Sequence, residues 1–271
     1  MKKIFTAIAL CAGLIQMTSA ANAADALKAA IANKQRTPSN VERDGARHPY
    51  ETLKFFGVKP TMTVVEISPG GGWYTEILAP YLKQHGKLIV GISDPESKNE
   101  NARRSYARFK QKLDNNPAMY SKVGIGIFEP SSDKINYAPA NSVDVVLTFR
   151  NIHNWIQFGD STMEAVFKTA FDSLKHGGVF GVVEHRLPES VTQTEKADTG
   201  YVHQSYVIQL AEKAGFKLAA KSEINANPKD NADHENGVWA LPPVLTNKEK
   251  DVEKYLAIGE SDRMTLKFVK P

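Results

Sequence analysis

Three short stretches of this sequence carry residue types that can bind a charged ligand or move a proton. A glycine-rich turn, Ser68-Pro69-Gly70-Gly71-Gly72, follows an apolar run that contains Glu66. Because glycine has no Cβ, a ligand can approach the backbone of such a turn closely. Asn151 and His153 lie in the second stretch, and His185 lies in the third. Imidazole groups titrate near neutral pH, so both histidines are candidate catalytic bases; hydrogen bonding that only braces loops is the alternative for each.

Glu66 bears on which ligand the glycine-rich turn could hold. A dinucleotide brings a pyrophosphate to this position, and a carboxylate leading into the turn would repel it. The spacing also departs from G-x-G-x-x-G, because Thr75 stands where the third glycine would be. S-adenosylmethionine carries a sulfonium and an ammonium group and no phosphate, so Glu66 would attract it. A tight turn without a ligand, next to a solvated acid, is the alternative interpretation.

Histidine and glutamate side chains elsewhere in the chain raise the question of a metal site. Three imidazoles and one carboxylate would suit zinc. The candidates are His153, His185, His203, His234, Glu184 and Glu235. Their spacing matches no metal-binding motif, so we expect no stoichiometric metal.

Apolar strands and helical segments alternate along the chain. Strands are predicted at residues 62–67, 87–92, 123–128, 143–149, 179–183, 216–224 and 264–270. Helices are predicted from a Ser39 cap to residue 56, at 73–83, from Asp94-Pro95 towards 113, at 160–175 and at 201–214. This alternation indicates an α/β fold with a doubly wound, mostly parallel sheet. A long loop at residues 225–247 is predicted to carry function or to cover a site.

The N-terminus has the pattern of a secretory signal peptide. Lys2 and Lys3 precede an apolar stretch at residues 4–17, and Ala21-Asn22-Ala23 resembles an A-x-A cleavage site. We therefore predict a signal peptide at residues 1–23, export to the bacterial periplasm, and a single domain at residues 24–271. Leu10 before Cys11 argues against a lipid anchor, and cleavage would leave no stable membrane anchor and no cysteine. An uncleaved anchor is the alternative.

Composition and charge exclude several classes of protein. The 271 residues are 42% hydrophobic and 24% charged, which excludes a disordered chain. After the N-terminus, no apolar run is long enough for a polytopic membrane protein. The net charge of +4 falls by two when Lys2 and Lys3 are removed, so nothing favours a nucleic-acid partner. The basic stretch at residues 103–112 is interpreted as a solvated helix face.

Five groups of residues between positions 40 and 271 form a recognisable set of motifs. They are residues 64–80, 151–155, 174–178 with 183–186, 237–243, and 262–271. With these motifs in this order, the chain resembles the class I S-adenosylmethionine-dependent methyltransferases. It is most similar to a group of bacterial methyltransferases of unassigned substrate that carry a secretory signal. The resemblance implies a Rossmann-like, doubly wound, seven-stranded sheet with an antiparallel last strand.

The resemblance also implies roles for individual residues around S-adenosylmethionine. The methionine part of the cofactor would be held by Glu66, Ser68, Gly70 and Gly72, although Ser68 replaces the usual first glycine. Asp94 would bind the ribose hydroxyls, although the acid usually stands at the strand tip, where Ile92 and Ser93 occur. Glu129 is a candidate for the adenine neighbourhood, with a solvated turn acid as the alternative. Asn151 would lie beside the reacting methyl group.

From these observations we expect the protein to be a methyltransferase that acts on a small hydroxylated or carboxylated molecule. His153 and His185 are the candidate catalytic residues, and Arg47, His48, Arg150 and Arg186 could supply donors to the substrate. A non-catalytic ligand-binding protein on the same scaffold is the alternative, because a fold does not fix a function. A nicotinamide-dependent oxidoreductase is disfavoured by Glu66 and Thr75.

Overall fold

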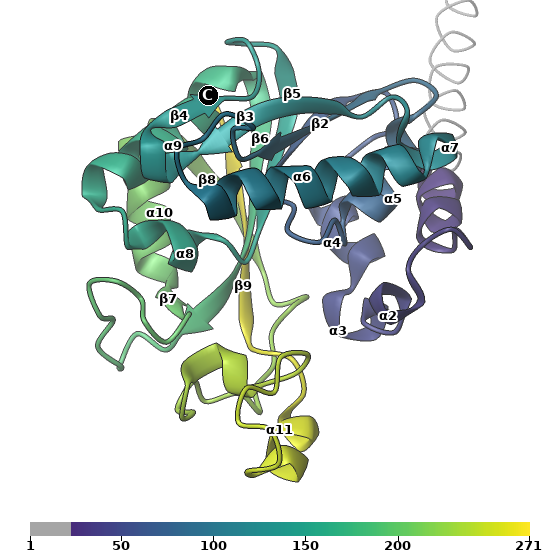
Figure 1. Ribbon diagram of the computed structural model, residues 1–271. Helices are drawn as coiled ribbons and strands as arrows, with labels where there is room; N and C mark the ends of the chain where they lie inside the picture. The colour runs from purple at the N-terminus through teal and green to yellow at the C-terminus, as the bar shows by residue number, and fades with distance from the viewer. Residues whose placement is uncertain (1–22) are drawn as a thin grey trace, which may run out of the picture.

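A nine-stranded sheet runs through the part of the chain that the computed structural model describes, residues 23–271 (Figure 1). The strand order is β4-β3-β2-β1-β5-β6-β9-β8, and β7 pairs with β6 outside this path. The strands are β1 Thr63–Ile67, β2 Lys87–Ile92, β3 Gly124–Glu129, β4 Lys134–Asn136, β5 Val143–Phe149, β6 Leu174–Leu187, β7 Val202–His203, β8 Lys217–Ser222 and β9 Arg263–Val269.

Strand direction agrees with the prediction of a mostly parallel, doubly wound sheet. β1 is parallel to β2 and β5, β2 to β3, and β5 to β6. The last strand, β9, is antiparallel to both β6 and β8, as predicted. The predicted count of seven strands is wrong because β4 and β7 are additional. These two strands contain three and two residues, too few to show an alternating pattern in the sequence.

Helices cover both faces of the sheet. The apolar side chains of α4 and α5 pack with those of α6 and α7 on one face, and α8, α9 and α10 cover the other. The helices are α2 Pro38–Val41, α3 Asp44–Arg47, α4 Pro49–Phe56, α5 Thr75–Leu82, α6 Glu100–Asn115, α7 Pro117–Tyr120, α8 Ile152–Ile156, α9 Asp160–Ser173, α10 Gln204–Lys213 and α11 Val252–Ile258. Residues 23–31 are also helical, and η1 Pro130–Ser132 and η2 Gly237–Ala240 are short 3-10 helices.

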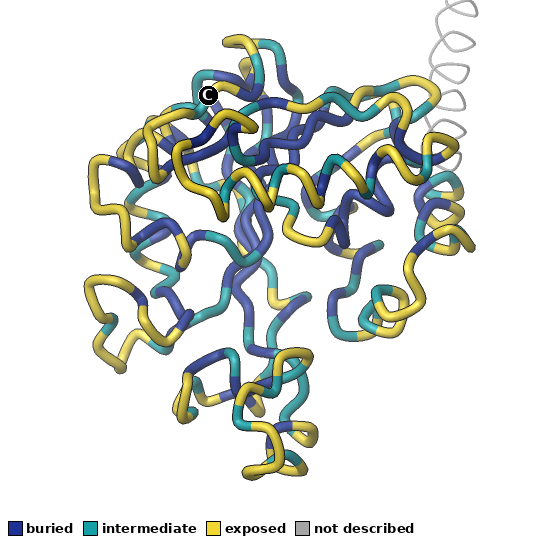
Figure 2. The backbone as a smooth tube through the Cα atoms, viewed as in Figure 1, coloured by how far each residue is buried: buried dark blue, intermediate teal, exposed yellow. Residues whose placement is uncertain are grey.

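The core has two layers because successive strand residues point to opposite faces. Val64 faces α4 and α5, while Val65 faces α9. Phe56 and Phe180 are fully buried in the two layers, and Figure 2 shows the strands as the most buried part of the backbone. Each such aromatic side chain contributes about 1.5–3 kcal/mol of hydrophobic stabilisation. The two layers therefore hold the ends of the strands in fixed positions.

The prediction of one continuous helix from the Ser39 cap to residue 56 is wrong. The structure divides it into α2, α3 and α4, and Ser39 lies inside α2, where Thr37 is the N-cap residue. His48 interrupts the helix with a positive φ of 43°, and Pro49 then starts α4. A residue before proline is disfavoured in the α region, whereas proline itself suits the first helical position. The break brings Arg47 into α3 with its side chain buried.

Two other element boundaries differ from the predictions. The helix expected to open at Asp94-Pro95 begins at Glu100, where the side chain of Asn99 accepts from the N–H of Asn101 at 2.9 Å. The segment His176-Gly177-Gly178 does not end a helix but lies inside β6. Gly177 donates to the carbonyl of Lys270 at 2.8 Å, so the C-terminus pairs with this segment as part of the sheet.

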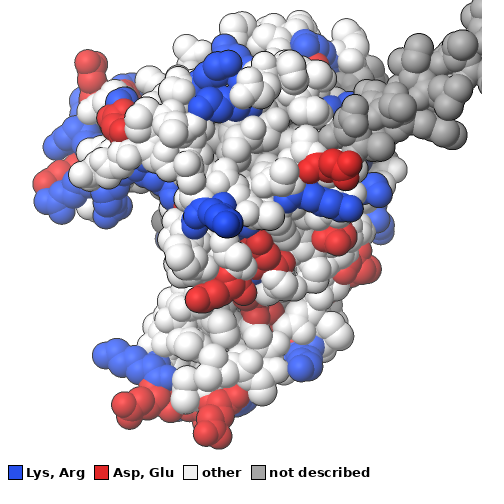
Figure 3. Space-filling model, turned by 90° about the vertical axis from the view of Figure 1, so that its right-hand side faces the viewer, with Lys and Arg blue, Asp and Glu red and all other residues white. Residues whose placement is uncertain are grey.

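Charged side chains of both signs are mixed on the surface. On the face shown in Figure 3, lysine and arginine alternate with aspartate and glutamate without a broad area of one sign. Helix α6 presents exposed Arg104 paired with Glu100 and Lys110 paired with Asp114. This arrangement confirms the interpretation of residues 103–112 as a solvated helix face.

The predicted signal peptide lies outside the described residues, apart from Ala23. The cleavage site after Ala23 therefore stays a prediction. Across residues 23–271, no helix has both the length and the apolar composition needed to cross a membrane.

Candidate functional site

The carboxyl ends of β1, β2, β5 and β6 meet at one edge of the sheet because these strands are parallel. In doubly wound sheets, ligands bind at this edge. The turn after β1, the loop after β2 and the residues after β5 all lie there. β9 runs in the opposite direction, so its first residue, Arg263, pairs with His185 at the same edge. The predicted cofactor and catalytic residues are therefore brought to one side of the sheet.

The turn after β1 contains three residues with left-handed backbone conformations. The φ angles are 50° at Ser68, 58° at Gly70 and 80° at Gly72. Gly70 and Gly71 are exposed, and a Cβ added to either would have no atom within 4 Å. A Cβ on Gly72 would instead lie 2.9 Å from Cε of Lys112. Gly70 and Gly71 thus leave the backbone open to a ligand, while Gly72 allows the turn to pack against α6.

Glu66 points from β1 towards α5 and is almost completely buried, at 2% exposure. Its Oε2 accepts a hydrogen bond from the hydroxyl of Thr75 at 2.6 Å. Burial raises the pKa of Glu66 to about 7, although the Thr75 hydrogen bond and the charge of Lys112 act in the opposite direction. Thr75, which replaces the third glycine of the dinucleotide motif, is therefore a partner of this acid. The interpretation of Glu66 as a solvated acid is wrong.

Asp94 follows β2 and has a protein partner on each carboxylate oxygen. Oδ2 is paired with the ammonium of Lys134, and Oδ1 accepts from the N–H of Glu96 at 2.8 Å. These two hydrogen bonds, with that from Lys134 the stronger, lower the pKa of Asp94. Asp94 thus stays ionised and able to accept further hydrogen bonds from hydroxyl groups.

Glu129 is buried at 4% exposure and connects two loops. Its Oε2 accepts from the N–H of Asp94 at 2.9 Å, and its Oε1 accepts from the hydroxyls of Ser97 and Ser132. Burial by itself would raise the pKa of Glu129, but these hydrogen bonds outweigh it and lower the pKa. The alternative of a solvated turn acid is wrong, and the carboxylate holds the loop after β2 in place.

Asn151 connects the end of β5 to the turn after β1. Its side-chain amide donates to the carbonyls of Ile67 and Ser68 at 3.2 and 3.1 Å. The same amide lies 3.1 Å from the hydroxyl of Thr148. Asn151 is therefore placed beside the predicted cofactor turn, and its amide fixes the backbone of that turn.

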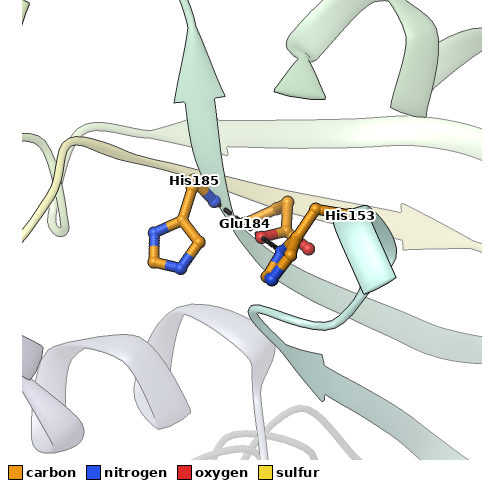
Figure 4. A group of neighbouring side chains, drawn as sticks. All are labelled: His153, Glu184 and His185. Atoms are coloured by element: carbon orange, nitrogen blue, oxygen red, sulfur yellow. Dashed lines mark hydrogen bonds and ion pairs between the residues drawn. The ribbon is translucent and has the colours of Figure 1, made fainter. Parts of the chain in front are cut away.

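The buried carboxylate of Glu184 holds both His153 and the backbone of the neighbouring residues (Figure 4). Nδ1 of His153 lies 2.9 Å from Oε1 of Glu184, which also accepts from the N–H of His185 at 2.8 Å. The other oxygen accepts from the N–H of Ile152 at 2.5 Å. An ionised carboxylate only accepts hydrogen bonds, so Nδ1 of a neutral His153 carries the proton and Nε2 keeps its lone pair. This is the tautomer that a general base requires.

His185 lies beside His153 but in a different chemical setting. The two ring centroids are 5.2 Å apart, and Nδ1 of His185 lies 2.6 Å from the hydroxyl of Ser261. Burial, followed by the charges of His153 and Arg150, lowers the pKa of His185 well below 6.5. His185 is therefore neutral at pH 7 and is a weaker base than an ordinary histidine.

The six candidate metal ligands do not gather at one place. Only His153, Glu184 and His185 offer ligand atoms within 4.8 Å of one another in the described part of the chain. His203 lies 2.7 Å from the carbonyl of Val191, and Glu235 pairs with Lys250. The sixth candidate, His234, lies 2.8 Å from Asp230.

A cavity of about 290 Å³ lies against the two histidines. One part of its wall comes from α3 and the residues around it, and another from the segment between β8 and β9, residues 223–262, which we call the β8–β9 segment. The lining includes Arg43, Arg47, Arg150, His153, His185, Trp239, Pro242, Pro243, Glu260 and Ser261. The predicted long loop at residues 225–247 therefore covers part of a cavity, since it contains Trp239 and the two prolines.

Two of the four predicted substrate donors, Arg47 and Arg150, line this cavity. Arg186 does not line it, because its guanidinium is paired with Asp262 at 2.8 Å and with Glu223 at 2.7 Å. These two acids raise the pKa of Arg186. The prediction of Arg186 as a substrate donor is therefore wrong, and His48 serves as the residue that separates α3 from α4.

Sequence reasoning missed three residues of the site. Arg43 lies 2.6 Å from Glu260, a pair separated by 217 positions. Trp239 belongs to η2, and its ring centroid is 6.0 Å from that of His153. The only signal was that Trp239 lies in one of the motif segments that carry the resemblance.

Comparison with solved structures gives the same fold at low sequence identity. A methyltransferase from Aquifex aeolicus described as SAM-dependent aligns with a TM-score of 0.55 and 16% identity, over 87% of this chain and 94% of its own. Geranyl diphosphate C-methyltransferase from Streptomyces coelicolor aligns with a TM-score of 0.55 and 11% identity, over 90% and 88%. It was solved with Mg²⁺, geranyl diphosphate and S-adenosyl-L-homocysteine.

The fold also occurs in an enzyme named for another reaction. The [4+2]-cyclase SpnF aligns with a TM-score of 0.57 and 15% identity, over 88% of this chain and 84% of its own. No protein-family model matches the chain, and no curated protein matches it. The chain therefore has the class I fold of these S-adenosylmethionine-dependent methyltransferases.

Proposed function

We propose that this protein is an S-adenosylmethionine-dependent methyltransferase that acts on a small hydroxylated or carboxylated molecule. The observation that carries the proposal is His153, which Glu184 holds as the Nδ1–H tautomer beside a cavity at the carboxyl edge of the sheet. The sheet that positions this group has the fold of solved methyltransferases. One of those neighbours was solved with S-adenosyl-L-homocysteine, which supports the cofactor assignment.

The turn after β1 fits the methionine part of S-adenosylmethionine. Its backbone is open at Gly70, and Ser68 precedes it in a left-handed conformation. In its ionised form, which is reached as the pH rises through about 7, Glu66 can attract the ammonium group of the cofactor, and Asp94 can accept from its ribose hydroxyls. When bound, the cofactor supplies an electrophilic methyl group.

His153 acts as the base in this proposal. Nε2 accepts the proton of the substrate hydroxyl while the oxygen forms its bond to the methyl carbon. Glu184 stabilises the resulting imidazolium through its contact with Nδ1 at 2.9 Å. Arg47 and Arg150 orient the substrate from the wall of the cavity, and such positioning supplies a large part of the rate enhancement.

Calorimetric titration with S-adenosylmethionine and S-adenosylhomocysteine tests the cofactor assignment. We expect micromolar dissociation constants, corresponding to about −8 kcal/mol. Gly71→Ala separates ligand binding from folding. The added methyl group enters open space, so we expect the fold to be preserved while a bound ligand is obstructed. We expect it to keep the wild-type unfolding midpoint and to bind S-adenosylhomocysteine several-fold more weakly. Absence of binding heat with both compounds would contradict the assignment of S-adenosylmethionine as the cofactor.

Turnover tests the role of His153. Once a methyl acceptor is in hand, His153→Ala is expected to lower kcat by about 10²–10⁴ with little change in the affinity for S-adenosylhomocysteine. His176→Ala is a matched control, because this histidine is exposed and lies 2.7 Å from the carbonyl oxygen of Pro271. An unchanged kcat in His153→Ala would remove the proposed base.

A non-catalytic ligand-binding protein is the second candidate. The same fold occurs in a [4+2]-cyclase, so the scaffold is not limited to methyl transfer and does not by itself fix the function. A ligand that co-purifies and is identified by mass spectrometry, together with no binding of S-adenosylhomocysteine, would favour this candidate.

We further propose that the protein needs no stoichiometric metal. Both oxygens of Glu184 already accept N–H groups, and Arg47, Arg150 and Arg263 place positive charge around His185. A divalent cation is disfavoured in such a field. Elemental analysis after dialysis should find less than one zinc per chain, and one retained zinc per chain would contradict the proposal.

Export to the bacterial periplasm is proposed from the pattern of residues 1–23. We expect the protein recovered from a periplasmic fraction to begin at Ala24. N-terminal sequencing measures this directly. Recovery in the cytosol with residues 1–23 attached would contradict it.

A further inference from the structure

The cavity beside His153 is rich in guanidinium groups. Arg43, Arg47 and Arg150 all line it, and Arg263 lies next to it at the start of β9. The lining also includes apolar residues, among them Trp239, Pro242 and Pro243. The cavity thus combines cationic and apolar lining residues.

One carboxylate is shared among these arginines. Glu260 accepts from Arg43 at 2.6 Å and from Arg263 at 2.9 Å, and it lies 3.5 Å from Nε of Arg47. Glu184, the acid that contacts His153, is committed to that imidazole and to backbone N–H groups. Among the residues that line the cavity, Glu260 is the one acid against three arginines, which leaves an excess of positive charge in the lining.

Arg47 and Arg150 have the least compensation. Arg47 is only 4% exposed, and its Nε and Nη1 have no hydrogen-bond partner. Its guanidinium lies over the ring of Trp73, with Cζ 4.7 Å from the ring centroid. Within residues 23–271, the side chain of Arg150 makes no hydrogen bond or ion pair.

Burial with too few acidic partners disfavours the charged forms of both Arg47 and Arg150. Burial lowers the pKa of Arg47, and the charge of Arg150 lowers it further. Burial also lowers the pKa of Arg150, with the charge of Arg263 as the next cause. Guanidinium groups stay protonated in proteins, so these two charges remain only partly compensated within the protein.

We propose that this cavity binds the carboxylate of a small hydroxy acid through Arg47 and Arg150, with the body of the acid against Trp239 and its hydroxyl at Nε2 of His153. A carboxylate matches the planar donor fork of arginine, and bidentate pairs of this kind are strong in buried sites. A volume of about 290 Å³ lies at the lower end for small-molecule sites, which favours a compact molecule.

This assignment rests on the proposed function for its chemical step. The hydroxyl oxygen of the acid forms a bond to the methyl carbon of S-adenosylmethionine, and the bond from that carbon to sulfur breaks. The hydroxyl proton moves to His153, and S-adenosylhomocysteine leaves as a neutral thioether at sulfur. The product is the methyl ether of the acid, with its carboxylate unchanged.

Binding measurements without the cofactor test the anion site independently of methyl transfer. The probes are 4-hydroxybenzoate, its methyl ester and 4-hydroxyphenyl phosphate, titrated into the purified protein and followed by calorimetry or ligand-observed NMR. We expect the acid to bind at least tenfold more tightly than the ester. Equal affinity for acid and ester would overturn the proposal, and so would tighter binding of the phosphate monoester, which would assign the site to phosphate.

Variants identify the residues responsible. Arg150→Gln should weaken the acid at least tenfold and leave the ester unchanged, while Trp239→Ala should weaken both. Arg104→Gln, on the exposed face of α6, is the matched control and should change neither. Arg47→Lys keeps a charge in the buried position but loses the planar fork, so it should weaken the acid while preserving the fold. An Arg150→Gln protein that binds the acid as the wild type does would overturn the assignment.

The two proposals can fail separately. Binding of the acid without binding of S-adenosylhomocysteine would leave the anion site standing and remove the methyltransferase. Binding of S-adenosylhomocysteine without a preference for the acid over its ester would remove the anion site and leave the methyltransferase proposal standing.

Discussion

Replacing Glu66 with glutamine should make the protein more stable at alkaline pH. Burial raises the pKa of Glu66 from 4.5 to about 7. A raised pKa means that the folded state binds the proton more tightly than the unfolded state. The contribution of Glu66 to stability is therefore complete below about pH 4.5 and is lost as the pH rises through about 7. The shift corresponds to about 3 kcal/mol, since each pKa unit is about 1.4 kcal/mol.

Urea unfolding of the wild type and of Glu66→Gln between pH 5 and pH 9 measures this difference. Glutamine keeps an oxygen that can accept from Thr75, so the two proteins should have similar free energies of unfolding near pH 5. By pH 8 the variant should be more stable than the wild type by about 3 kcal/mol. Glu249→Gln, at an exposed position in the β8–β9 segment, is the control and should change the free energy of unfolding by less than about 0.5 kcal/mol.

Cofactor binding gives a second measurement on the same pair of proteins. If the ammonium group of S-adenosylhomocysteine is drawn to an ionised Glu66, its affinity for the wild type should rise between pH 6 and pH 8. The affinity for Glu66→Gln should change little across this range. Two free-energy curves that stay parallel from pH 5 to pH 9 would refute the argument, because they would show that Glu66 does not titrate near neutrality.

Three other substitutions test the packing that positions the site, each by urea unfolding. Gly126→Ala places a Cβ 2.3 Å from Cα of Tyr137, so it should cost about 3 kcal/mol, and a loss below 1 kcal/mol would contradict the close approach of β3 and the chain after β4. Phe180→Ala removes a fully buried ring that stacks with Phe216, and we expect a loss of about 3–5 kcal/mol, with a smaller loss for Phe180→Leu, which still fills part of the space. Asn151→Ala should cost about 1–3 kcal/mol and weaken S-adenosylhomocysteine several-fold; unchanged affinity would show that the tether to Ser68 is not needed for the turn.

The parts of the fold that follow from local sequence were predictable. β5 has the predicted bounds because five of residues 143–149 are apolar and the strand lies in the middle of the sheet. The glycine-rich turn was recognisable because its conformations need φ values that glycine adopts easily. The break at His48 was missed although Pro49 signalled it, because the flanking residues suit a helix. β4 was missed because its pairing with β3 depends on a partner strand.

The site was only partly predictable, because several of its contacts join residues that are far apart in the sequence. Sequence places His153 and Glu184 at the ends of two strands, and parallel pairing of β5 with β6 then brings them together. The orientation of the imidazole depends on a buried carboxylate contact that no spacing encodes. Arg43 and Glu260 meet only because the β8–β9 segment folds back over the sheet edge. Pairing over such sequence separations follows from tertiary structure alone.

The β8–β9 segment leaves the sheet and returns to it on adjacent strands. β8 ends at Ser222 and β9 begins at Arg263, and Ser222 is in register with Thr265. In Figure 1 the intervening residues form a separate lobe below the strands. Since both attachment points are fixed by the sheet, evolution can lengthen, shorten or exchange this insertion without altering the order of the strands. A chimera that carries the insertion of another protein of this fold should thus keep the order of the strands, together with Arg47 and Arg150, while it replaces the part of the cavity lining that contains Trp239.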